Sequence, residues 1–129
     1  MPSIFTKIVS GEIPAHKVHE DDRFLAFLDI NPLREGHTLV IPKVEIDYFF
    51  DLPDDLLRDI MVFAREVARK IEAVIPCERI GITVIGLEVP HTHVHLIPID
   101  SVTDMNFAKP KLSLSQSEMA DLAEKIRKA

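Results

Sequence analysis

The chain has 129 residues, a length typical of one domain, and its 47% hydrophobic and 28% charged residues form an ordinary globular balance. The single cysteine, Cys77, excludes a disulfide scaffold, and we expect a cytoplasmic protein because no signal peptide or membrane span is evident. The net charge of −6, without any block of Lys or Arg, disfavours binding to nucleic acid or a membrane surface.

The first third of the chain predicts a short helix followed by three strands. Ser3 can cap a helix over residues 4–10 that stops at Gly11. Three strands are then expected, each closed by turn-forming residues, at positions 17–20, 23–30 and 37–41.

The remainder predicts one long helix, two strands and a last helix. Apolar residues recur at helical spacing over residues 53–74, and Pro76 ends the pattern. Strands are expected at 79–85 and 91–97, an irregular segment at 100–113, and a helix from the capping box Ser115/Glu118 to about residue 128. Consecutive strands joined by short turns, with one long helix inserted, predict an α+β fold in which helices lie on one side of an antiparallel sheet. We expect residues 1–129 to form a single domain.

The most informative feature is the segment from His91 to Pro98, which holds half of the six histidines. On a strand, alternate side chains share a face, so His91, His93 and His95 would form a row at roughly 6.6 Å spacing. Thr92, Val94 and Leu96 would lie on the other face, toward the core.

Three ordinary explanations of this row remain open. It could be a solvated strand face, or a nucleotide-binding surface without catalysis. It could also hold a metal, but the outer two histidines would lie roughly 13 Å apart, too far to share one zinc easily.

The fourth explanation is nucleophilic catalysis by an imidazole. A histidine is largely neutral at pH 7, and crowding of imidazoles disfavours their protonation further. A neutral ring can attack phosphorus through one nitrogen while its other N–H is held by an acceptor, and neighbouring imidazoles can donate to phosphate oxygens.

The segment resembles the signature of the histidine-triad (HIT) family, and three other segments share the resemblance in the right order: residues 4–14 (IFTKIVSGEIP), 24–32 (FLAFLDINP) and 36–43 (GHTLVIPK). Together they span a core of residues 3–98, followed by the C-terminal segment and helix of residues 99–129. The similarity is greatest to the histidine-triad nucleotide-binding proteins. It implies a HIT-like fold, a homodimer and a purine nucleotide substrate of the AMP or GMP type.

The resemblance also implies roles for individual residues. His93 would be the nucleophile, and His95 would contact the phosphate and help position or protonate the leaving group. His91 and His37 would support them. Asp29 would accept hydrogen bonds from the ribose, although a strand-ending turn with Asn31 is the alternative. The base pocket would be lined by apolar residues that could equally be ordinary core, namely Ile4, Phe5, Ile8, Phe27, Leu28 and Ile30.

Two departures from the family pattern stand out. Ser3, Thr6 and Glu45 occupy three of the four zinc-ligand positions of many bacterial relatives, leaving only His91, so we expect neither a metal nor another cofactor.

The second departure precedes the triad. A Gln and a small polar residue are replaced by Leu87 and Glu88, and the usual phosphate-binding Asn is missing, with Thr83 nearest to its place. Leu87 cannot donate a hydrogen bond, so it either slows turnover of generic substrates or faces the core. The resemblance as a whole implies hydrolysis or transfer at the α-phosphate of a purine nucleotide conjugate, of the nucleoside phosphoramidate or dinucleotide type, through a nucleotidyl-His93 intermediate. A nucleotide-binding protein with weak or no catalysis is the alternative.

Overall fold

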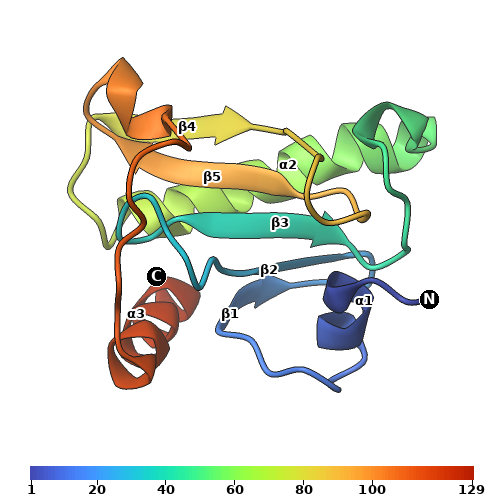
Figure 1. The fold of residues 1–129 in the computed structure, drawn as a ribbon, viewed down its shortest axis with the longest axis horizontal. Helices are drawn as coiled ribbons and strands as arrows, with labels where there is room; N and C mark the ends of the chain where they lie inside the picture. Colours follow the sequence, from blue (N-terminus) through green and yellow to red (C-terminus); the bar gives the residue numbers. More distant parts are fainter.

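Five antiparallel strands form one sheet in the order β1-β2-β3-β5-β4 (Figure 1), in a computed structural model that describes residues 1–129. The strands are β1 (Lys17–Glu20), β2 (Phe24–Leu28), β3 (Thr38–Pro42), β4 (Arg79–Thr83) and β5 (Val94–Ile99). The α-helices are α1 (Ile4–Val9), α2 (Asp54–Glu72) and α3 (Gln116–Lys128). Two 3₁₀ helices, η1 (Phe49–Asp51) and η2 (Val102–Met105), complete the chain. The expected α+β architecture is confirmed.

Helices α2 and α3 cover one face of the sheet, and Figure 1 shows α2 running behind β5 and β3. The larger core cluster fills this layer and contains Ile60, Phe63 and Val67 of α2 together with Val94 and Leu96 of β5. The prediction that Val94 and Leu96 face the core is thus confirmed. Amphipathic spacing in α2 explains the arrangement, because its apolar residues recur every three or four positions.

The opposite face carries a smaller apolar cluster beneath α1. Phe5 and Ile8 of this helix pack with Phe27 of β2 and Leu39 of β3. Ser3 caps α1 by accepting a hydrogen bond from the Thr6 N–H at 3.0 Å, as the sequence predicted. This lightly covered face of the sheet is the one that carries His95.

The expected strand from His91 begins only at Val94, which corrects the sequence prediction. Val40 pairs with Val94, so continuing the register would place Thr92 opposite Pro42. Pro42 has no N–H to donate, and the ladder stops there. The Thr92 N–H instead donates to the Ile46 carbonyl at 2.7 Å. The three histidines nevertheless stay together on the α1 side of the sheet, since Phe5 contacts the rings of both His91 and His93 and the His93 ring lies 5.1 Å from that of His95.

No helix of the chain combines the length and the apolar character needed to cross a membrane.

Candidate active site

The four predicted histidines gather at one place, although they come from different segments. His37 precedes β3, His91 and His93 lie in the loop before β5, and His95 lies within β5. All four are nearly inaccessible to solvent, with exposures between 0% and 7%. The ring centroids of His93 and His95 lie 5.1 Å apart, and those of His37 and His95 5.2 Å.

His93 has one ring nitrogen fixed and one free. Its Nδ1 lies 2.7 Å from the carbonyl oxygen of His91, which can only accept, so Nδ1 carries the proton. In the neutral ring Nε2 then has an unshared pair, and no hydrogen bond within the protein occupies it. Phe5 packs edge-on against the ring at 5.0 Å. A ring with its Nδ1–H held by an acceptor and its Nε2 free has the geometry that an imidazole nucleophile needs.

A chain of hydrogen bonds sets the tautomer of His95. The Leu33 N–H donates to Nδ1 of His37 at 3.0 Å, so the His37 proton is on Nε2. That Nε2–H donates to Nδ1 of His95 at 2.9 Å, which leaves the His95 proton on its own Nε2. Burial lowers the pKa of His37 to about 3 and that of His95 to about 4, so both rings are neutral near pH 7.

Gly36 makes this position of His37 possible. Its φ of 94° lies in the left-handed region that favours glycine. A Cβ there would lie 3.0 Å from the Ile75 side chain and 3.2 Å from Pro98. The turn before β3 can therefore pass close to Ile75 and Pro98 and place His37 against His95.

His91 is fixed by a network that includes the three residues found at the zinc-ligand positions. Its Nε2–H donates to the Pro42 carbonyl at 2.8 Å, and Ser3 Oγ lies 2.8 Å from its Nδ1. The Thr6 hydroxyl and the Ser3 N–H both donate to Glu45 Oε1 at 2.6 Å, and these bonds lower the pKa of the Glu45 carboxyl. Burial lowers the pKa of His91.

Asp29 combines the two expectations made for it. Its Oδ1 accepts from the Asn31 N–H at 2.8 Å, as in a strand-ending turn, while its side chain also lines a cavity beside His93. Oδ2 lies 3.5 Å from Nε2 of His37, and burial raises the Asp29 pKa. Asp29, His37 and His95 are close enough to hold a cation. However, the 2.9 Å hydrogen bond between the two imidazoles already accounts for their approach.

A cavity of about 270 Å³ lies between α1 and the end of β2 and reaches His93 and His95. Eight of the nine predicted nucleotide-binding residues line it: Ile4, Phe5, Ile8, Phe27, Leu28, Asp29, Ile30 and Glu88. Ile4 and Ile30 are 50% and 68% exposed, so they form its rim rather than the core. We call this space the α1 cavity.

Thr83 is the exception among the predicted binding residues. It stands opposite His95 in the ladder between β4 and β5, so the two side chains share a face. It lines none of the cavities that contain His93. The structure thus places Thr83 beside His95 but outside the three cavities that His93 lines.

Leu87 does not face the core, and that alternative is wrong. The side chain is 88% exposed and lines a second cavity at His93 and His95, of about 210 Å³. We call this space the Leu87 cavity. Its lining includes Phe107, whose ring lies 4.9 Å from that of His95, and which the sequence did not single out.

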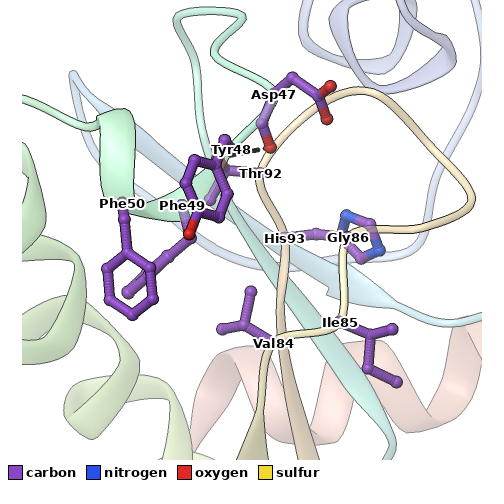
Figure 2. Close-up of a pocket in the computed structure, with 9 residues that line it drawn as sticks. All are labelled: Asp47, Tyr48, Phe49, Phe50, Val84, Ile85, Gly86, Thr92 and His93. Atoms are coloured by element: carbon purple, nitrogen blue, oxygen red, sulfur yellow. Dashed lines mark hydrogen bonds between the residues drawn. The ribbon is translucent and has the colours of Figure 1, made fainter.

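A third cavity, of about 490 Å³, lies on the η1 side of His93. Figure 2 shows the rings of Tyr48, Phe49 and Phe50 gathered on one side of it and His93 on the other. The Thr92 hydroxyl ties this part of the chain to the triad by donating to the Ile46 carbonyl at 2.7 Å.

Comparisons with known proteins agree with this geometry. The HIT domain family matches residues 10–102. An uncharacterized HIT-like protein of Methanocaldococcus jannaschii is 43% identical over 102 residues, covering 74% of this chain and 77% of that protein. An adenosine 5'-monophosphoramidase of Saccharomyces cerevisiae is 41% identical over 97 residues, covering 74% and 61%. A HIT-like protein from Bartonella henselae superimposes with a TM-score of 0.84 at 29% identity, covering 98% of this chain and 94% of that chain.

Proposed function

The chain belongs to the HIT domain family, and we propose that it is a hydrolase that cleaves purine nucleoside phosphoramidates at the α-phosphate. The observation that carries this proposal is the free Nε2 of His93, whose ring lines the α1 cavity and is oriented by the bond from Nδ1–H to the His91 carbonyl. The yeast relative named as a phosphoramidase supports the choice of substrate.

In the first step, the Nε2 lone pair of His93 forms a bond to the α-phosphorus. The bond from phosphorus to nitrogen breaks, its electron pair leaves with the nitrogen, and the nitrogen takes a proton from water to become the free amine. A nucleotidyl-His93 intermediate remains. The Nε2–H of His95 donates to a phosphate oxygen, where negative charge concentrates in the transition state.

In the second step, a water molecule attacks the same phosphorus. The bond to His93 breaks and its electron pair returns to Nε2, while the proton of the water goes to solvent. The products are a nucleoside 5'-monophosphate and an amine. The base would lie against Phe5 and Phe27 in the α1 cavity, and Asp29 would accept from the ribose hydroxyls.

One observation favours a second candidate, a nucleotide-binding protein with weak or no catalysis. Neither the α1 cavity nor the Leu87 cavity has a Lys or Arg in its lining, so a phosphate placed over His93 would meet no lysine or arginine side chain there.

Mass spectrometry separates the two candidates. The protein is mixed with an AMP amidate, quenched in base within seconds, digested and searched for AMP on each histidine peptide. We expect AMP on the peptide that contains His93, and release of AMP over many turnovers. Tight AMP binding with neither adduct nor turnover would instead identify a binding protein.

A further inference from the structure

The Leu87 cavity continues from the α1 cavity across the triad. The two cavities share Glu88, His93 and His95 as lining residues. Ile85, Gly86, Leu87 and Phe107 complete the Leu87 cavity. A nucleotide whose base fills the α1 cavity and whose phosphate lies over His93 therefore has the Leu87 cavity beside its phosphate.

In-line displacement decides which part of the substrate enters this cavity. The nucleophile and the leaving group lie on opposite sides of the phosphorus. His93 forms one wall of the cavity, so a leaving group that points away from Nε2 lies against the other walls.

Those other walls are apolar. Leu87 is 88% exposed and Ile85 is 46% exposed, and both line the Leu87 cavity. Large apolar side chains that gather at a concave surface commonly mark a binding site. Phe107 stands edge-on to His95 at 4.9 Å and to His37 at 6.1 Å.

The position of Phe107 is built into the C-terminal segment. The side-chain oxygen of Asn106 accepts from the Ala108 N–H at 2.9 Å, and Lys111 Nζ donates to the Phe107 carbonyl at 2.6 Å. The Leu112 N–H donates to the Pro32 carbonyl at 2.8 Å and ties the segment to the turn after β2. The Phe107 ring is thereby held in its edge-on contact with the imidazoles.

The charge of the lining excludes one class of leaving group. The lining of the Leu87 cavity contains no Lys or Arg, and its one acidic side chain, the Glu88 carboxylate, would repel a phosphate chain. The ammonium of Lys111 lies 5.8 Å from the centre of the Phe107 ring, but it does not line the cavity and already donates to the Phe107 carbonyl.

Resting on the proposed phosphoramidase activity, we propose that Ile85, Leu87 and Phe107 form a subsite for the leaving group. It takes an amine that carries an aromatic or branched aliphatic body, in preference to ammonia or a phosphate chain. Contact with Leu87 and Phe107 removes the apolar body of the amine from water, and an aromatic body gains the edge-on geometry that Phe107 offers.

The test uses three substrates with the same AMP moiety: the unsubstituted amidate, the benzylamine amidate and diadenosine tetraphosphate. Their kcat/KM values are compared in wild type, Phe107→Ala, Leu87→Gln and the control Val102→Ala. Val102 is 91% exposed on η2 and lines none of the cavities at His93. We expect wild type to prefer the benzylamine amidate over the unsubstituted one by at least about tenfold.

The variants test where that preference originates. Phe107→Ala should lose most of it, falling far more on the benzylamine amidate than on the unsubstituted one. Leu87→Gln should also lower the preference while raising kcat/KM for the unsubstituted amidate, because the amide can donate to the phosphate. Val102→Ala should match wild type.

Equal losses on both amidates in Phe107→Ala would show that this ring only positions His95, and would overturn the proposal, as would a preference for the tetraphosphate. An AMP adduct on His93 without preference for the aromatic amine refutes the subsite alone. Absence of any adduct refutes the proposed function itself. If Phe107→Ala does not fold, the same comparison is made with Phe107→Leu, which should retain part of the preference.

Discussion

The hydroxyl of Ser3 lies 2.8 Å from Nδ1 of His91, although the two residues are 88 positions apart in the chain. The Nε2–H of His91 is engaged by the Pro42 carbonyl, so Nδ1 must accept and the Ser3 hydroxyl donates. The carbonyl of His91 in turn receives the Nδ1–H of His93. Ser3 thus stabilises the ring whose backbone orients the proposed nucleophile.

We predict that Ser3→Ala destabilises the protein by about 1–3 kcal/mol, because it leaves Nδ1 of a fully buried imidazole without a donor and removes the cap of α1. Urea unfolding monitored by circular dichroism measures this loss. Ser10→Ala is the matched control, since the Ser10 hydroxyl donates to the Lys7 carbonyl in an exposed position. A Ser3→Ala variant as stable as the control would show that the contact contributes nothing.

The same network leads to a prediction about metal content. Ser3, Thr6 and Glu45 surround His91 with two hydroxyls and one carboxylate that bond to one another, and hydroxyls are poor zinc ligands beside thiolates. We expect less than about 0.1 zinc per chain by elemental analysis of protein purified without added metal, whereas an occupied structural site would give about one zinc per chain.

A triple variant serves as the control for this metal prediction. Ser3→Cys, Thr6→Cys and Glu45→His together place two thiols and an imidazole around His91, and this variant should bind one zinc. Stoichiometric zinc in the wild-type protein would contradict the prediction.

We predict that His93→Ala lowers kcat for an AMP amidate by at least about a thousandfold, because the reaction loses its nucleophile. Nucleotide binding should be retained, since the α1 cavity keeps the rest of its lining. Initial rates give the first result and isothermal titration with AMP gives the second. Turnover near the wild-type rate in His93→Ala would show that another group attacks the phosphorus.

The sequence predicted most of this site because its positions are set by local rules. The capped helix, the strand ending at Pro42 and the glycine turn before His37 all follow from residue types at fixed spacing. Seven of the eight predicted residues that line the α1 cavity came from segments whose order matches the family, and the eighth, Glu88, came from the stretch that departs from it. What the sequence could not predict depends on contacts between distant residues.

Phe107 illustrates this limit. It lies in a segment without apolar periodicity, and its place over His95 depends on bonds such as that between Leu112 and Pro32. The loop from His91 to His93 is a second example. Its sequence suits a strand, but the ladder needs a donor that Pro42 cannot supply, so tertiary context overrides local pattern.

Acid is predicted to destabilise the fold through its buried imidazoles. The pKa values of about 3 for His37 and about 4 for His95 lie below the ordinary value of 6.5, because burial disfavours the charged rings. Below pH 6.5 the unfolded chain therefore binds protons that the folded chain does not. The free energy of unfolding decreases as the pH is lowered from 6.5 towards the pKa values of the folded state. Above pH 6.5 these groups contribute no pH dependence.

The lowered pKa of His91 also makes the fold less stable in acid. The raised pKa of Asp29 has the opposite effect, because the folded chain then binds its proton more readily than the unfolded chain does. Each imidazole contributes up to about 1.4 kcal/mol per pH unit, so we expect a net loss of roughly 2 kcal/mol or more between pH 7.5 and 5. Urea titrations at several pH values measure it. His37→Gln should show a shallower dependence, and equal stability of the wild-type protein at both pH values would refute the account.

The last prediction is a symmetric homodimer formed through β4 and α2. Strand β4 is an edge of the sheet, and an edge strand offers unpaired backbone groups to a second chain. The other edge, β1, is packed against α3. Apolar side chains are exposed on β4 and α2, with Ile82 at 50% and Val62 at 47%. Pairing with a second copy of the chain would bury both, and a twofold interface is the commonest solution.

We therefore expect twice the mass of the 14.6 kDa chain in sedimentation velocity at micromolar concentration. Ile82→Lys places an ammonium in the proposed interface and should yield a folded monomer, because a buried unpaired charge costs several kcal/mol. Val102→Lys is the matched control, since Val102 is exposed on η2 and should remain a dimer when changed. A wild-type monomer at this concentration would refute the dimer. A dimer that persists in Ile82→Lys would place the interface on another surface.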